Sequence, residues 1–194
     1  MPTVTALRDD RRGRVAVELD GAPWRVLPAD VVVRAGLVEG RTLDRDALRL
    51  VGRELRRAEA LRVAGLALRN RDLSRRRLAD RLERSVPPQA AAESLATLER
   101  AGLVDDERVA RARAVALADR GWGDEAIRHR LQAEAFDEPV VGEAVHALEP
   151  EAERARRLIE RRGAGPRTAR YLSGRGFGEE AVEAALGATF GQDA

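Results

Sequence analysis

The sequence predicts a mainly α-helical protein made of three tandem three-helix repeats, with a small β-hairpin in its amino-terminal part. Two observations lead to this fold class. The spacing of apolar residues changes from two to about 3.6 residues near Pro28, which marks a passage from strand to helix. A motif also returns: residues 98–110 are followed by two segments of similar layout, 127–148 and 168–186, each with a leucine five residues before a phenylalanine. Repeated helical units usually form a scaffold that presents a surface.

The hairpin is predicted around Asp20-Gly21, a strong two-residue turn signal. Apolar residues alternate with polar or small ones on both sides of it: Val15, Val17 and Leu19 before, and Ala22, Trp24 and Val26 after. This turn predicts that Val17 faces Trp24 and Val15 faces Val26. Pro23 makes the second strand an edge strand, and residues 3–7 are a candidate third strand.

The first helices follow from their breakers and caps. Pro28 opens a short helix over 29–35, and Gly36 ends it. A long helix is expected from Asp44 or Asp46 to about residue 70, with its apolar residues at Leu48, Val51, Leu55, Ala58, Leu61 and Leu66. Ser74 caps a short helix to residue 84, and a proline pair at 87–88 starts the next one. Their predicted inward residues are Leu78 and Leu82, then Ala91, Leu95 and Leu98.

The second and third repeats continue this order. Asp105 caps a helix over 106–120, with Val109, Ala112 and Ala116 predicted to face inward. Helices over 124–135 and 139–148 complete the second repeat, and helices over 151–162, 166–173 and 179–186 make the third. The predicted divisions are 1–52 for the hairpin and short helix, 53–100, 101–148 and 149–187 for the repeats, and 188–194 for a tail.

Composition excludes several classes of protein. The chain has no cysteine, so disulfides, thiolate metal sites and a cysteine nucleophile are excluded. No secretion signal or membrane-length apolar run is evident, so we expect a cytoplasmic protein. All 35 basic residues are arginine. Residues 53–84 carry 11 arginines against 5 acidic residues, whereas residues 85–160 carry 10 against 16. This asymmetry indicates a polar surface with two kinds of partner.

A search for catalytic chemistry finds little. His129, between two arginines, is expected to face solvent, with a general base as the alternative. His146 has no partner at metal-ligand spacing, and no phosphate-binding glycine loop is present. The carboxylates at 105–107 are better explained as an N-cap and a first helical turn than as a metal site. We therefore expect no enzyme, no metal and no cofactor. Trp122, between two glycines, is expected to pack at a repeat junction, with base stacking as the alternative.

The sharpest signal is an arginine cluster at the start of the helix that Ser74 caps. Arg77, Arg81 and Arg84 share one helical face, and Arg75 and Arg76 precede them. Three adjacent arginines at a helix start meet the unfavourable end of its dipole, which suggests an anionic partner. Pairing of Arg76 and its neighbours with Asp80 and Glu83 would instead make part of the cluster a solvated surface.

Several stretches resemble the RecX family, bacterial regulators of the recombinase RecA. They are residues 67–78, 98–110, 120–123 with Ile127 and Leu131, and 171–177. The chain departs from the family pattern at Val109, where a phenylalanine is usual, and at Arg77, where a glutamate is common. The resemblance implies tandem three-helix repeats that bind along the groove of the RecA filament on single-stranded DNA. It also implies inhibition of the recombinase's ATPase and strand exchange, in DNA repair, recombination and the SOS response, without catalysis by this chain.

The candidate filament- or DNA-binding residues are Arg71, Arg75, Arg76, Arg77, Arg81, Arg84, Arg120, Trp122, Arg128, Arg170 and Arg175. The expected partner is the RecA filament, with single- or double-stranded DNA as a further partner, and the expected state is a monomer. Two alternatives stay open. One is a helical DNA-binding protein that acts without a recombinase, and the other is a nuclease that uses the carboxylates at 105–107.

Overall fold

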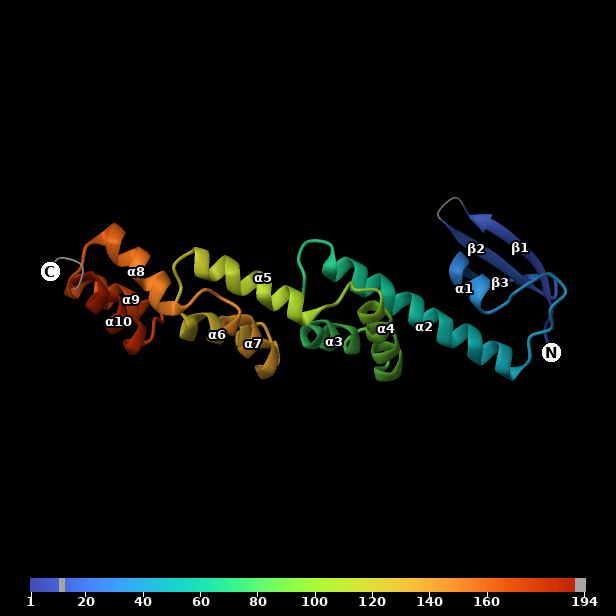
Figure 1. Ribbon diagram of the computed structural model, residues 1–194. Helices are drawn as coiled ribbons and strands as arrows, with labels where there is room; N and C mark the ends of the chain where they lie inside the picture. The colour runs from blue at the N-terminus through green and yellow to red at the C-terminus, as the bar shows by residue number, and fades with distance from the viewer. Residues whose placement is uncertain (11–12, 191–194) are drawn as a thin grey trace. The chain divides into compact units, whose positions relative to one another are not determined.

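The computed structural model describes residues 1–10 and 13–190, which form two compact units (Figure 1). Unit 1 contains residues 1–71 and 78–101, and unit 2 contains residues 72–77 and those from Gly102 onward. The fold is mainly helical with one small antiparallel sheet, as the sequence predicts. No helix in the described part of the chain is long and apolar enough to cross a membrane.

The sheet in unit 1 has three strands in the order β1 (Val4–Asp10), β2 (Arg14–Leu19) and β3 (Ala22–Pro28). The candidate third strand is therefore confirmed as β1. The predicted pairing across the hairpin is wrong by one residue, since Val17 lies opposite Arg25. A bulge at Trp24 inserts one extra residue into β3 and shifts the pairing beyond it. Leu27 is consequently buried opposite Val15, and Val26 is exposed.

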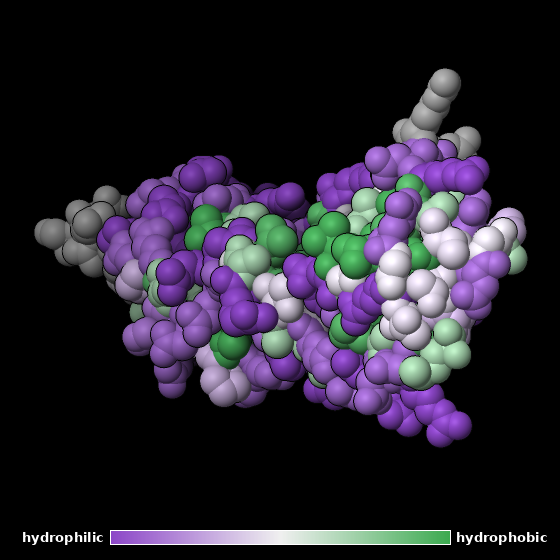
Figure 2. Space-filling view, turned by 90° about the vertical axis from the view of Figure 1, so that its right-hand side faces the viewer, coloured by the Kyte–Doolittle hydropathy of each residue, from purple (hydrophilic) through white to green (hydrophobic). Residues whose placement is uncertain are grey.

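Helix α1 (Ala29–Arg34) and the first part of α2 (Arg45–Leu68) cover this sheet and close a core. Asp44 caps α2 by accepting a hydrogen bond from the backbone of Ala47 at 2.7 Å. The core contains side chains from the sheet, from the two helices and from the segment between them. They include Val4, Val15, Val17, Leu27, Val32, Leu43 and Val51. Leu48 and Leu66, two of the apolar residues at helical spacing in α2, are exposed. In Figure 2, green hydrophobic residues form small groups among purple hydrophilic ones.

Helix α2 also packs against α4 (Pro88–Arg100), which begins at the proline pair. The predicted inward residues Ala91, Leu95 and Leu98 are buried, as are Leu78 and Leu82 of α3 (Arg75–Glu83). The boundary between the two compact units runs through α3, after Arg77.

Unit 2 contains two three-helix groups. The first consists of α5 (Asp106–Asp119), α6 (Asp124–Ala133) and α7 (Glu138–His146), and the second of α8 (Glu151–Arg162), α9 (Pro166–Gly174) and α10 (Glu179–Phe190). Each has its own core, around Ile127, Leu131 and Phe136 in the first and around Ile159, Leu172 and Phe177 in the second. Helix α10 continues into the segment predicted as a tail, and residues 191–194 lie outside the described residues.

The inward face of α5 differs from the prediction. Val109 is buried as expected, but Ala112 and Ala116 are exposed, and Ala110 and Ala114 are buried in their place. Asp105 caps this helix as predicted, by accepting a hydrogen bond from the backbone of Arg108 at 2.9 Å.

Helices α3 and α6 begin with the same kind of hydrogen bond, in which the first N–H of the helix donates to a carboxylate at the start of a later helix. The first N–H of α3, at Arg75, donates to the Asp106 carboxylate at 2.7 Å, and Asp106 opens α5. The first N–H of α6, at Asp124, donates to the Glu151 carboxylate at 2.5 Å, and Glu151 opens α8. The corresponding first residue of α9 is Pro166, which has no N–H to donate.

Candidate functional site

A groove of about 950 Å³ in unit 2 lies along α5, α6 and the end of α9. Four arginines line it, and Glu125 and Glu134 are the acidic residues among its lining. The arginines are Arg77, Arg113, Arg120 and Arg130. The groove therefore has an excess of positive charge, and guanidinium groups bind carboxylate and phosphate through paired hydrogen bonds.

Helical spacing explains how the sequence builds this groove. Arg113, Leu117 and Arg120 are spaced i, i+4 and i+7, so they share one face of α5. On α6, Ala126 and Arg130 are likewise four residues apart. Both helices turn their other faces to the core of the first three-helix group in unit 2, which leaves these faces to the groove.

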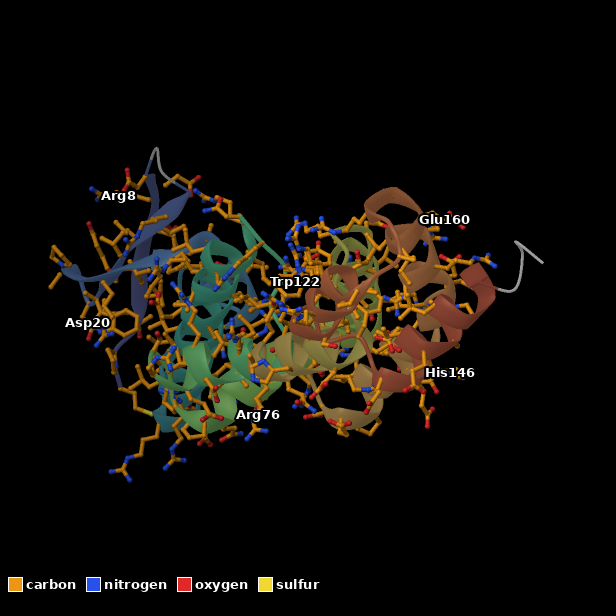
Figure 3. The ribbon with its side chains drawn as sticks, turned by 90° about the vertical axis from the view of Figure 1, so that its left-hand side faces the viewer. Arg8, Asp20, Arg76, Trp122, His146 and Glu160 are labelled. Atoms are coloured by element: carbon orange, nitrogen blue, oxygen red, sulfur yellow. The ribbon has the colours of Figure 1, made fainter. Side chains whose placement is uncertain are left out.

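Trp122, which is labelled in Figure 3, lines the groove, and two guanidinium groups lie close to its ring. The guanidinium carbon of Arg130 is 3.9 Å from the centroid of the ring, and that of Arg175 is 4.5 Å away. Arg175 is also 5.2 Å from the ring of Tyr171, over which Arg162 lies at 3.8 Å. Alternating rings and guanidinium groups thus form a continuous row that joins the two three-helix groups of unit 2, and each contact stabilises the orientation of its arginine.

The turn that carries Trp122 is fixed by a close backbone contact. A Cβ atom on Gly123 would lie 2.2 Å from the carbonyl oxygen of Gly176, so only glycine fits. The Gly123 N–H donates to the Arg175 carbonyl at 2.9 Å, and the Glu125 N–H donates to the Gly176 carbonyl at 3.1 Å. The prediction that Trp122 packs at a repeat junction is confirmed, because its ring contacts Arg175 of the following three-helix group.

Arg154 of α8 also binds the turn that carries Trp122. Its side chain is only 6% exposed, and it occupies the position in α8 that Val109 has in α5. The guanidinium donates to the carbonyls of Trp122 and Glu149, both at 3.0 Å, and to the carboxylate of Asp124. These bonds satisfy a buried charge, which would otherwise be costly.

The arginines at the start of α3 have different surroundings. Arg77 donates to the carbonyl of Ala133 at 2.6 Å, and so caps the last turn of α6. Ser74 has its expected place before α3, but its hydroxyl donates to the carbonyl of Glu134 at 2.6 Å, and its bond from the Arg77 N–H is long, at 3.4 Å. Arg77 therefore has a structural contact as well as a place in the groove.

Arg76 is exposed, and within the described residues its side chain forms no ion pair with Asp80 or Glu83 (Figure 3). The alternative in which those carboxylates neutralise Arg76 is thus not what the structure shows.

The structure brings together four of the sequence-predicted site residues: Arg77, Arg120, Trp122 and Arg175. Arg175 contacts the ring of Trp122 and donates to the carbonyl of Arg120 at 3.4 Å. Four others are in unit 2 but do not line this groove: Arg75, Arg76, Arg128 and Arg170. The remaining three, Arg71, Arg81 and Arg84, belong to unit 1 and are exposed.

Sequence reasoning missed several residues of this site. Arg113, Arg130, Arg162 and Tyr171 were not singled out, although Arg113 could have been found from its seven-residue spacing to Arg120. His129, expected to face solvent, is indeed exposed and lines the groove.

Metal and acid–base chemistry have little support. Among the described residues, no group of three or more histidine, cysteine, aspartate or glutamate side chains could hold a metal ion. Asp105 and Asp106 both accept backbone hydrogen bonds instead. The clearest shift of a carboxyl pKa outside α2 is at Glu149, where bidentate hydrogen bonds from Arg157, both 2.5 Å long, hold the pKa below its usual range.

No family model matches the chain. The curated protein "Regulatory protein RecX" from Leuconostoc citreum (strain KM20) is 31% identical over 115 residues, which are 57% of this chain. The match spans 42% of the length of that relative. A crystal structure of "regulatory protein RecX" superposes with a TM-score of 0.77 at 20% identity, and covers 94% of this chain and 98% of the other. The crystal structure of RecX from Lactobacillus salivarius has a TM-score of 0.60 at 15% identity, and covers 68% and 94%. The chain is therefore similar in part of its sequence to a RecX protein, and it has the fold of the two RecX crystal structures.

Proposed function

We propose that this chain is a regulatory protein that binds RecA filaments on single-stranded DNA and inhibits the recombinase. The observation that carries the proposal is the arginine-lined groove of unit 2, in which Arg130 and Arg175 enclose Trp122. Such a surface recognises anionic groups without chemistry of its own. The similarity to a RecX regulatory protein supports the recombinase as the partner.

The three repeats, proposed as residues 53–100, 101–148 and 149–187, are the scaffold of this activity. Each presents helices whose outer faces are rich in charge, and a series of such units can follow a long, repeating partner. We propose that the chain acts as a monomer, because the repeats supply the successive contacts within one molecule.

Co-sedimentation with RecA filaments tests the proposal. Filaments are assembled on single-stranded DNA with a non-hydrolysable nucleotide, so that they stay intact, and the bound fraction of the purified chain is measured. The chain should bind these filaments and should lower the DNA-dependent ATPase rate of RecA in a parallel assay with ATP. A chain that neither sediments with filaments nor changes the ATPase rate would refute the proposal.

Variants of α3 test the part played by its arginines. Arg76 and Arg81 are exposed, so replacing both with alanine should leave the helical content intact. Each lost charge-assisted hydrogen bond at an interface should weaken binding by about 1.5–3 kcal/mol. The matched control replaces Arg156 and Arg157 of α8, which already form ion pairs with Glu153 and Glu149. Equal loss of filament binding in the two double variants would show that α3 has no special role.

DNA binding without a recombinase is the second candidate, favoured by the excess of arginine in residues 53–84. A salt titration of binding to naked DNA, with and without RecA, separates the two functions, because phosphate contacts make affinity fall steeply with salt. If RecA adds nothing to DNA binding at any salt concentration, the second function is correct.

We also propose that the chain has no catalytic activity. Within the described residues, the groove lining has one serine, Ser173, and one histidine, His129, and no hydrogen bond joins them as a nucleophile and its base. Nucleotide hydrolysis or DNA cleavage by the purified chain, in the absence of RecA and with Mg²⁺ present, would contradict this.

A further inference from the structure

The first half of α2, in unit 1, carries a row of exposed arginines that the groove of unit 2 does not include. Arg45, Arg49, Arg53 and Arg56 are spaced i, i+4, i+8 and i+11, so they lie on one face of the helix. We call these four residues the α2 stripe. Together with Leu48, Gly52 and Gln89 they line a shallow depression of about 570 Å³.

Three of the four stripe arginines lack the acidic partners that other arginines of α2 have. Arg57 pairs with Glu54 at 3.8 Å, and Arg62 pairs with Glu59 at 2.7 Å. Of the stripe, only Arg49 has such a partner, Asp46 at 2.8 Å. Within the described part of the chain, the other three stripe side chains form no ion pair. The helix therefore presents a row of net positive charge.

This arrangement opposes the stability of the helix. Arg49 and Arg53 are four residues apart and Arg53 and Arg56 three apart, and like charges at these spacings repel one another. Arg45 is the first residue of α2, where the helix dipole disfavours a positive charge. The guanidinium of Arg56 lies 3.4 Å from where a Cβ atom on Gly52 would be, so this side chain lies back along the helix towards Arg53. An anionic ligand would relieve the repulsion.

We propose that the α2 stripe is a binding site for the phosphodiester backbone of nucleic acid. The four arginines extend over 11 residue steps, or about 16 Å of helix, which suits a polymer with regularly spaced charges. Planar guanidinium groups match phosphate oxygens bidentately. An acidic protein surface is the weaker fit, because protein interfaces have an apolar centre and Leu48, 40% exposed, is the sole large apolar residue in the lining of the depression.

The site goes beyond the filament binding proposed above, since it assigns nucleic-acid binding to four particular residues of unit 1 that the groove does not include. Binding is measured with the full chain by fluorescence anisotropy, using a labelled 30-nucleotide oligothymidine and a labelled 30-base-pair duplex. The test variant is Arg53→Gln with Arg56→Gln. The matched control is Arg62→Gln with Arg100→Gln, which removes the same charge from unit 1 but from side chains bonded within their own helices.

The stripe variant should bind at least about tenfold more weakly near 0.1 M salt. Its plot of log affinity against log salt should lose a slope of about 1.4 with the single strand or about 1.8 with the duplex, as expected for two lost phosphate contacts. The control should keep the slope of the parent. A loss with both oligonucleotides, or with one alone, supports the proposal and identifies the form of nucleic acid that is bound.

Three results would overturn it: no binding by the parent, no loss in the stripe variant, or an equal loss in the control. A polyglutamate peptide that binds the parent but not the stripe variant, while the oligonucleotides bind both, would assign the stripe to an acidic protein instead. Circular dichroism checks folding, and a second variant, Arg45→Gln with Arg53→Gln, replaces the first if that one loses helix. Filament co-sedimentation of the parent is scored separately, so the two proposals fail independently.

Discussion

Replacing Gly123 with alanine should separate the two three-helix groups of unit 2 at their junction. Gly123 has an extended backbone, with φ −81° and ψ 169°, which alanine adopts without strain. The only obstacle is the added methyl group, which would lie 2.2 Å from the carbonyl oxygen of Gly176 and 2.3 Å from the backbone nitrogen of Phe177. Both neighbours are backbone atoms, so the two turns must move apart.

The cost has two parts. Overpacking a close contact costs about 1–3 kcal/mol. The hydrogen bonds from the Gly123 N–H to Arg175, 2.9 Å, and from the Glu125 N–H to Gly176, 3.1 Å, lengthen or break, at about 0.5–1.5 kcal/mol each. Since these terms overlap, we expect the free energy of unfolding of unit 2 to fall by about 2–5 kcal/mol.

Urea denaturation followed by tryptophan fluorescence measures this loss. The chain has two tryptophans, so Trp24→Phe leaves Trp122 as the reporter of unit 2. The emission of Trp122 should also change in the folded variant, because Arg175 moves away from its ring. The control is Gly142→Ala in α7, where a Cβ would meet no atom within 4 Å, and where alanine should stabilise the helix by up to about 1 kcal/mol. A Gly123→Ala variant with the urea midpoint and emission of its parent would refute the reasoning.

Three further changes test the packing and electrostatics of unit 2. Arg154→Met should lower the free energy of unfolding by about 3–5 kcal/mol in urea, because it leaves Asp124 and two carbonyls without their donor, and Asp124→Asn in the same chain should recover part of the loss. Glu149→Gln should remove the contribution to stability that comes from the lowered pKa of Glu149. That contribution is present above the unfolded carboxyl pKa of about 4.3 and disappears as pH falls through the lower folded pKa. The melting temperatures of variant and parent should therefore converge between about pH 6 and pH 3. Leu131→Ala, at a fully buried position, should cost about 2–5 kcal/mol by denaturation, and a smaller loss would show that the core can close around the cavity.

The sequence predicts the helices well because their ends carry strong local signals. Asp44, Asp105 and the prolines at 88, 139 and 166 all stand at helix starts in the structure. The inward face of α5 could not be predicted from the same information. Its arginine–alanine alternation offers small apolar residues on several faces, so the pattern alone does not distinguish the buried Ala110 and Ala114 from the exposed Ala112 and Ala116.

The candidate site was only partly predictable, for a different reason. Trp122 and Arg175 belong to recognisable motifs, but their contact depends on two turns that are more than fifty residues apart in the chain and meet through backbone atoms. Arg154 would be read as a surface residue in any helical pattern, since nothing local shows that three acceptors surround it. The bulge at Trp24 likewise depends on the pairing of whole strands, which a turn motif does not specify.

Pro166 ends a series of hydrogen bonds that recurs at the starts of α3 and α6. Within unit 2, Arg75 and Asp124 each donate a main-chain hydrogen bond to the carboxylate that opens the next long helix. Proline has no main-chain N–H, so α9 cannot begin with this hydrogen bond. To join a further three-helix group through the same hydrogen bond, an engineered chain would need two changes. A residue with an N–H, such as aspartate, would replace Pro166, and a carboxylate would open the added long helix.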